Sequence, residues 1–152
     1  MATVSFNSDP LEAMKQIRVF FKDHQAELND VTTLHLNGKG LQLLPAEIGL
    51  FVNLKTLSLS DNYLTGLPIE ITNLKDLMIL KVENNNFKQF PNEICSLSSL
   101  IHLSLANNQI EYIPDSLQSL SKLMILILSG NQLKTLPSSI GELFALRVLS
   151  LE

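Results

Sequence analysis

The chain has 152 residues, 45% of them hydrophobic and 17% charged, a balance typical of one globular domain rather than a disordered segment. Its formal net charge of −4, with no Lys- or Arg-rich cluster, argues against a nucleic-acid-binding surface. A single cysteine, Cys95, excludes an internal disulfide, and no run of about 18 to 20 apolar residues is available for a membrane-spanning helix.

The chain begins with "MATVSFNSDP", which has neither a basic segment nor an apolar run, so no signal peptide is visible. We therefore expect a cytoplasmic protein from the sequence as written. If a leader has been removed from the N-terminus, we expect a secreted or surface-exposed protein instead.

Residues 1–30 are predicted to form an amphipathic helical cap. Asp9 suits the N-cap, Pro10 the first helical position, and Glu12 completes a capping-box pattern. A helical stripe of apolar residues follows, with Phe20 and Leu28 nearby: Leu11, Met14, Ile17 and Phe21. The alternative is a helix that lies on a membrane or binds a partner helix.

From Val31 onward the same residue types recur every 23 residues. Five full repeats begin at Val31, Leu54, Leu77, Leu100 and Leu123, and a sixth begins at Leu146 and is truncated. The repeats follow the pattern L-x-x-L-x-L-x-x-N-x-L, which is the signature of leucine-rich repeats, with other apolar residues at some of the Leu positions. We treat residues 31–152, together with the cap, as one structural domain.

The first, fourth, sixth, eleventh, fourteenth, eighteenth and twenty-first positions of the repeats are always Leu, Ile, Val or Phe. The L-x-L alternation predicts a short strand with one face buried, and equivalent strands joined by return segments should stack as a parallel sheet. Apolar residues at steps of three after each Pro, as in Ile71 and Leu74, favour a 3₁₀ turn. An amide ladder is expected after the strands at Asn62, Asn85, Asn108 and Asn131.

These motifs resemble the leucine-rich repeat family in its 23-residue variety, with "LPxxIxxLxxL" on the outer face. The resemblance covers residues 31–152, about four-fifths of the chain. The chain resembles small bacterial members of the spirochaete or effector type, and it also resembles Ras-associated intracellular scaffolds. It implies a right-handed α/β solenoid with a concave parallel sheet of about six strands and a convex side of 3₁₀ turns. One departure is Lys39, which takes the Asn position of the first repeat.

The last strand, Leu146–Glu152, has nothing after it in the sequence. An exposed strand edge pairs readily with another copy or with a partner strand. A homodimer formed through this edge is therefore an expectation.

We find no pattern for catalysis. His35 and His102 are expected on strands three repeats apart, too far to share a metal ion, and His24 lies on the cap. No G-x-S-x-G elbow, phosphate-binding glycine loop or recurrent acid pair is present. The sequence therefore predicts no catalytic residue, no metal and no cofactor.

Side chains at the third, fifth and seventh positions should project from the concave face. The core does not require Ile at 79, 125 and 127 or Val at 148, and the resemblance implies that the concave sheet contacts proteins. We therefore expect a non-catalytic protein-binding module, for which the resemblance to bacterial members implies an effector or host-interacting role. The alternative is a structural protein that assembles through its C-terminal edge. The expected partner-binding residues are Ser58, Ile79, Lys81, Glu83, His102, Ser104, Ile125, Ile127, Val148 and Ser150.

Overall fold

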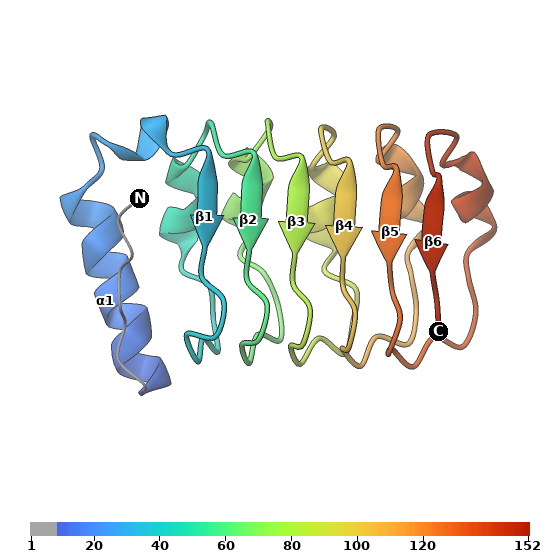
Figure 1. Ribbon diagram of the computed structural model, residues 1–152, viewed down its shortest axis with the longest axis horizontal. Coiled ribbons are helices and arrows are strands. Elements are labelled where there is room, and N and C mark those ends of the chain that lie inside the picture. The colour runs from blue at the N-terminus through green and yellow to red at the C-terminus, as the bar shows by residue number, and fades with distance from the viewer. Residues whose placement is uncertain (1–8) are drawn as a thin grey trace.

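The computed structural model describes residues 9–152, which form a solenoid of stacked coils capped by a helix (Figure 1). The helix α1 spans Pro10–Asp23 and precedes a 3₁₀ turn, η1, at Leu28–Asp30. The strands are β1 (Thr33–His35), β2 (Thr56–Ser58), β3 (Ile79–Lys81), β4 (His102–Ser104), β5 (Ile125–Ile127) and β6 (Val148–Ser150). The 3₁₀ turns between them are η2 (Ala46–Leu50), η3 (Ile69–Asn73), η4 (Asn92–Ser96), η5 (Asp115–Ser119) and η6 (Ser138–Glu142).

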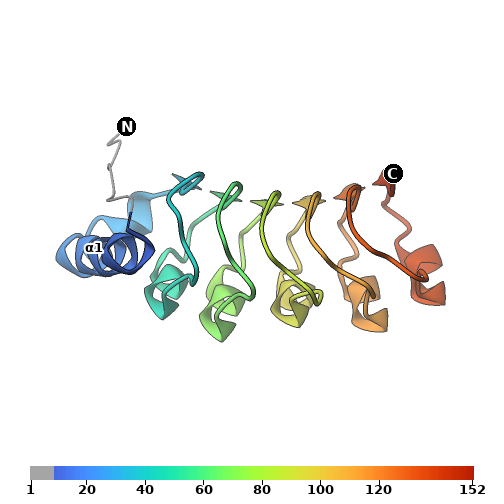
Figure 2. The same cartoon turned by 90° about the horizontal axis from the view of Figure 1, so that it is seen from below.

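The strands form one parallel sheet in the order β1-β2-β3-β4-β5-β6. Residues 23 apart are opposite one another, as in Leu34 with Leu57 and Leu80 with Leu103. Figure 2 shows the strands on one side of the molecule and the 3₁₀ turns on the other, more widely spaced side. The predicted solenoid with a concave sheet is confirmed.

The core is built from the apolar columns of the repeat. Leu57, Leu80, Leu103 and Leu126, at the strand centres, are completely buried. Every inward position of the third and fourth repeats is buried as well. These leucines are fully buried because each of their coils has a neighbouring coil on both sides. Burying each side chain stabilises the fold by about 1.5–3 kcal/mol.

A proline opens each return segment, as predicted. Pro68 precedes η3 with a φ of −70°, and the N–H of Leu74 closes that turn by donating to the Ile71 carbonyl at 3.0 Å. A 3₁₀ turn needs fewer residues than an α-helix to reverse the chain. The compact turn therefore returns the chain to the next strand within 23 residues.

The regular 23-residue spacing of Asn produces a buried amide ladder. Asn85 Oδ1 accepts a hydrogen bond from Leu64 N at 2.9 Å, and its Nδ2 donates to the carbonyls of Leu59 and Val82. Asn62 serves the first coil in the same way, accepting from the N–H groups of Lys39 and Leu41. The ladder thus links each coil to the preceding one and satisfies backbone groups that the turn leaves unpaired.

A second, exposed ladder runs beside the first, and sequence reasoning missed it. Asn84 Nδ2 donates to Asp61 Oδ1 at 2.8 Å, and Asn107 Nδ2 donates to Asn84 Oδ1 at 2.9 Å. All three residues have positive φ values, between 54° and 60°, and Gly130 continues the column with a φ of 70°. Asn, Asp and Gly are the residues that tolerate this left-handed conformation, so their recurrence at one position was the available signal.

The helix α1 covers the first coil. Asp9 Oδ1 accepts from Leu11 N at 3.0 Å, which confirms the predicted N-cap. Ile17 and Phe21 are buried, whereas Leu11 is 63% exposed, so its predicted place in the apolar stripe was wrong. The helix buries Ile17 and Phe21 in the core of the domain, whereas Leu11, near its start, does not reach that core. Arg18 adds an ion pair to Glu47 of η2, with 3.0 Å between Nε and Oε1.

The C-terminal coil departs from the predicted core. Leu136, Leu149 and Leu151 occupy inward positions of the repeat but are 38–43% exposed. Among residues 9–152, β6 is paired on one side only, with β5, and no coil of this part of the chain covers these side chains. Phe144, in the turn before β6, is 87% exposed.

Residues 1–8 lie outside the described part of the chain, and with them most of the segment in which no signal peptide is visible. Among residues 9–152, no helix is both long and apolar enough to cross a membrane.

Candidate partner-binding surface

The third-position column of the sheet places apolar side chains on both sides of a histidine. His102 on β4 is opposite Ile79 on β3 and Ile125 on β5, and Ile125 is opposite Val148 on β6. The side chains of Ile79, His102 and Ile125 are half-buried, and Val148 is 48% exposed. This predicted group of residues is therefore contiguous and open to solvent.

The fifth-position column is less uniform. Lys81, Ser104 and Ile127 are neighbours on β3, β4 and β5, and Ser150 follows on β6. Ser104 is completely buried, because the longer side chains of Lys81 and Ile127 flank its hydroxyl group. Lys81, Ile127 and Ser150 are half-buried and remain accessible.

Ser58 also differs from what its position suggested. It is 4% exposed, and its hydroxyl donates to Asn37 Oδ1 at 2.7 Å. Its role in the structure is therefore a contact between the first and second coils. Glu83, at the seventh position, is half-buried beyond the end of β3.

Sequence reasoning missed a second apolar column, at the residue before each strand. Met78 is 38% exposed, and Ile101 and Met124 are half-buried. The signal was present, because this column reads Thr32, Lys55, Met78, Ile101, Met124 and Arg147. The backbone explains the accessibility: Met78 O accepts from both Ile101 N and His102 N, so the chain turns into the strand at this point.

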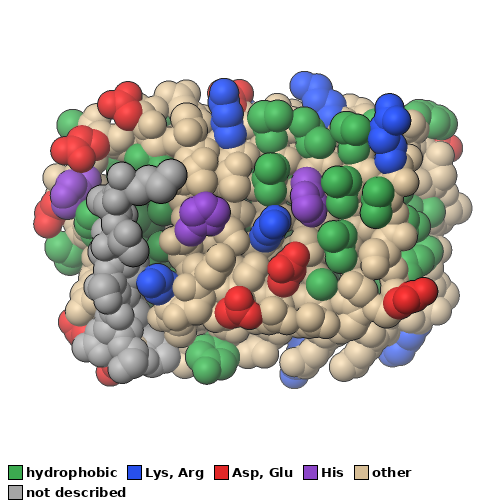
Figure 3. Space-filling model, in the orientation of Figure 1, with side chains coloured by type: hydrophobic (Ala, Val, Ile, Leu, Met, Phe, Trp, Pro, Cys, Tyr) green, Lys and Arg blue, Asp and Glu red, His purple; other side chains and the backbone are tan. Residues whose placement is uncertain are grey.

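Together these columns form one surface, which we call the concave apolar patch. Figure 3 shows hydrophobic side chains gathered over β3 to β6 and extending to the strand starts, with a histidine among them. The patch consists of Met78, Ile79, Ile101, Met124, Ile125, Ile127 and Val148.

Charged side chains border the patch on two sides with opposite sign (Figure 3). Near the strand starts lie Lys55, Lys122 and Arg147, all exposed, together with the adjacent exposed residues Lys75 and Asp76. Beyond the strand ends lie the acidic side chains of Asp61, Glu83 and Glu152. The sheet therefore has a basic edge and an acidic edge.

His102 has an unusual environment at the centre of the patch. Within the described residues, no hydrogen-bond partner reaches its Nε2 atom, and that atom is buried. Burial lowers the pKa of His102 below its usual value of 6.5, and the nearby Lys81 ammonium lowers it further, while Glu83 acts in the opposite direction. The imidazole is therefore neutral at pH 7 and contributes an uncharged ring to the patch.

Two serine hydroxyls beneath the same face are also unpaired. Ser60 Oγ and Ser104 Oγ are buried and have no hydrogen-bond partner among residues 9–152. His102 and Ser104 lie two residues apart on the same face of β4, but no hydrogen bond joins His102 Nε2 to Ser104 Oγ. The concave face thus presents apolar and charged side chains, and these residues do not form a nucleophile hydrogen-bonded to a base.

Other candidate sites are weaker. Within the described residues, no three His, Cys, Asp or Glu side chains are grouped closely enough to hold a metal ion. Cys95 is half-buried on η4, and burial raises the pKa of its thiol, which disfavours the reactive thiolate.

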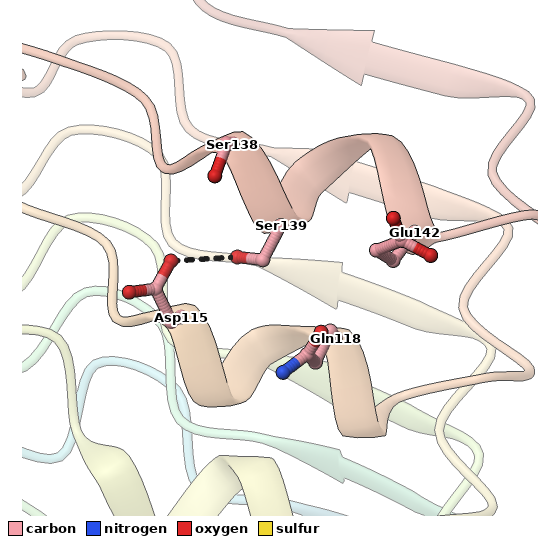
Figure 4. Close-up of a pocket in the computed structure, with 5 residues that line it drawn as sticks. All are labelled: Asp115, Gln118, Ser138, Ser139 and Glu142. Carbon is pink, nitrogen blue, oxygen red and sulfur yellow. Dashed lines mark hydrogen bonds between the residues drawn. The ribbon is translucent and has the colours of Figure 1, made fainter.

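A depression on the convex side lies between η5 and η6 (Figure 4), where Ser139 Oγ donates to Asp115 Oδ1 at 3.1 Å. Neither histidine nor lysine is present there to act as a base for a serine. Its lining residues are Asp115, Gln118, Ser138, Ser139 and Glu142.

Comparison with known proteins identifies related repeats. The family described as "Leucine rich repeat" matches residues 52–110 and, in an overlapping match, residues 75–133. No curated protein matches the sequence significantly.

Three solved structures illustrate the similarity. A leucine-rich repeat protein of Leptospira interrogans has 39% identity and a TM-score of 0.80 over 82% of this chain and 32% of that one. Internalin C2 of Listeria monocytogenes has 26% identity and a TM-score of 0.71 over 83% of this chain and 55% of that one. The ectodomain of a plant membrane receptor kinase from Arabidopsis thaliana, in complex with Casparian strip integrity factor 2, has 36% identity and a TM-score of 0.63. That match covers 70% of this chain and 13% of the other.

The chain thus spans about a third of the Leptospira protein and about half of the internalin. The family matches, the 23-residue coils and the bacterial structural neighbours agree with one another. The chain belongs to the leucine-rich repeat family and is similar to bacterial members of it.

Proposed function

We propose that the protein is a non-catalytic protein–protein interaction module that binds a protein partner through the concave apolar patch. The observation that carries this proposal is the accessible apolar surface over β3 to β6, formed by residues that the core does not need. Ile125 and Ile127 project side by side from β5 while Leu126 between them is completely buried. Rigid parallel strands present such anchors with little loss of conformational entropy on binding.

The family supports a binding role, since leucine-rich repeats are generally interaction modules without catalytic activity. The Arabidopsis ectodomain was solved in complex with another factor. The similarity to the Leptospira protein and to the Listeria internalin motivates a finer proposal, in which the partner is a host protein and the chain is part of a bacterial effector or surface protein.

The proposal predicts that two substitutions on β5 abolish binding. Ile125→Glu with Ile127→Glu places two carboxylates in the centre of the patch, and capture of partner proteins from host-cell lysate should be lost. Ile69→Glu is the matched control, because Ile69 is 64% exposed but lies on η3, on the convex side. Circular dichroism of all variants checks that they fold. Unchanged capture by the β5 variant, or equal loss with Ile69→Glu, would reject the site.

A second candidate function is self-assembly through the C-terminal edge. It is favoured by the exposure of Phe144, Leu149 and Leu151 beside β6, whose outer edge is unpaired. Light scattering across a concentration series should show a dimer that disappears when a polar capping segment is added after Glu152. A monomer at every concentration contradicts this reading.

A further inference from the structure

The spacing of the concave apolar patch restricts the backbone conformation of a partner that lies along the solenoid axis. Side chains of one column repeat once per strand, at about 4.7–4.9 Å. An α-helix presents a side chain on one face about every 5.4 Å, whereas an extended chain does so about every 6.4–6.8 Å. From β3 to β6, three strand steps span about 14 Å, three helical turns about 16 Å, and three same-face steps of an extended chain about 20 Å.

A helix therefore keeps one apolar side chain near each strand over the length of the patch, and an extended chain does not. The two methionines at the strand starts, Met78 and Met124, have flexible side chains that can adjust to the remaining difference of about 2 Å. Ile79, His102 and Ile125 are successive members of one column, so helix side chains at successive turns can pack between neighbouring members of that column.

The two charged edges of the sheet determine which flank of a bound helix faces each edge. Lys55, Lys122 and Arg147 near the strand starts favour carboxylates on one flank of the helix, and Glu83 and Asp61 favour cations on the other. A helix with its charges reversed would place like charges against both edges. The sheet therefore distinguishes between the two flanks of an amphipathic helix.

From this geometry we propose that the partner presents an amphipathic α-helix of about three turns, laid across β3 to β6, with acidic residues on the flank that faces Lys55 and Arg147. This inference rests on the proposed function, because it names the class of ligand for the same surface. The apolar face of the helix carries residues spaced i, i+4, i+7 and i+11, one for each of the four strands, and those residues pack between the side chains of the patch.

Two peptide libraries displayed on phage test the proposal. One randomises the exposed face of an alanine-rich helical scaffold, and the other randomises a scaffold of equal length that proline and glycine keep extended. We expect the purified protein to enrich helical clones with apolar residues at i, i+4, i+7 and i+11 and with Asp or Glu on one flank. Synthetic peptides made from these clones should lose about tenfold or more in affinity for the Ile125→Glu variant and less than about twofold for Ile69→Glu.

Charge reversal tests the orientation. Lys55→Glu combined with Arg147→Glu should weaken such a peptide by roughly threefold to tenfold, and exchanging the acidic flank of the peptide for lysine should restore the affinity. No effect of the double reversal would overturn the assignment of the acidic flank.

The outcomes separate this inference from the proposed function. If only extended clones are enriched and their binding depends on Ile125, the helical partner is wrong and the binding surface stands. If no clone from either library depends on Ile125, both are wrong.

Discussion

Phe21 of α1 lies edge-on against Phe51 of the first coil, with 4.8 Å between the ring centroids. Both rings are about 1% exposed, so the helix closes the end of the solenoid through this contact. Phe21→Ala should lower the free energy of unfolding by about 3–5 kcal/mol, because it removes the largest side chain that α1 buries. Phe144→Ala, at a phenylalanine that is 87% exposed, should change it by less than about 0.5 kcal/mol. Chemical denaturation measures both, and equal effects would contradict the role of α1 as a cap.

The buried amide ladder predicts a large effect from one asparagine. Asn85→Ala leaves the N–H of Leu64 and the carbonyls of Leu59 and Val82 without their side-chain partner. We expect a loss of about 2–4 kcal/mol in the free energy of unfolding, since each orphaned group costs about 1–3 kcal/mol and the costs are not additive. Asn92→Ala is the control, at an exposed asparagine of η4, and should be nearly neutral. A loss below about 1 kcal/mol for Asn85→Ala would show that water replaces the ladder.

The exposed ladder predicts that glycine is required at one position. Gly130 has a φ of 70°, and a Cβ atom there would overlap Asn107 Oδ1. Gly130→Ala should cost about 2 kcal/mol in thermal or chemical unfolding, from the left-handed backbone and the displaced amide. Gly66→Ala should be close to neutral, because nothing lies within 4 Å of the added carbon. Similar stability of the two variants would argue against the ladder.

The fold was largely predictable because the same pattern of apolar residues, Asn and Pro recurs every 23 residues. Leu57, Leu80, Leu103 and Leu126 were predicted as core and are completely buried, and residues 23 apart pair across the strands as expected. The less accurate predictions concern the two ends. Leu11 and Leu149 follow the apolar pattern, yet burial also requires a neighbouring coil, which a pattern within one segment does not report.

The surface was only partly predictable. The alternation rule identified Ile79, Ile125 and Val148 on the exposed face, but it could not show that Ser104 is covered by longer neighbours. It also overlooked Met78 and its column, because the two-residue period holds only within a strand and these residues precede it. Accessibility at such positions depends on how the chain enters the sheet.

The environment of His102 predicts a dependence of stability on pH. Its pKa is lowered in the folded protein, so the unfolded chain binds the proton more strongly. The stabilisation is therefore present above about pH 6.5 and is lost as the pH falls through the lower, folded-state pKa. Denaturation of the wild type and of His102→Asn from pH 8 to pH 5 should show a smaller loss for the variant.

An NMR titration of the His102 ring checks the same point directly, and a midpoint at or above 6.5 would contradict the burial of the imidazole in the apolar column.

Site-specific photo-crosslinking tests the central claim, that the partner binds the concave sheet. A benzophenone amino acid replaces Ile125 on β5 in one variant and Ile69 on η3 in the other, and each is irradiated in the cell lysate used for partner capture. Binding through the concave apolar patch predicts a discrete protein adduct from position 125 and none from position 69. An adduct from position 69 alone, or the same adducts from both positions, would contradict it.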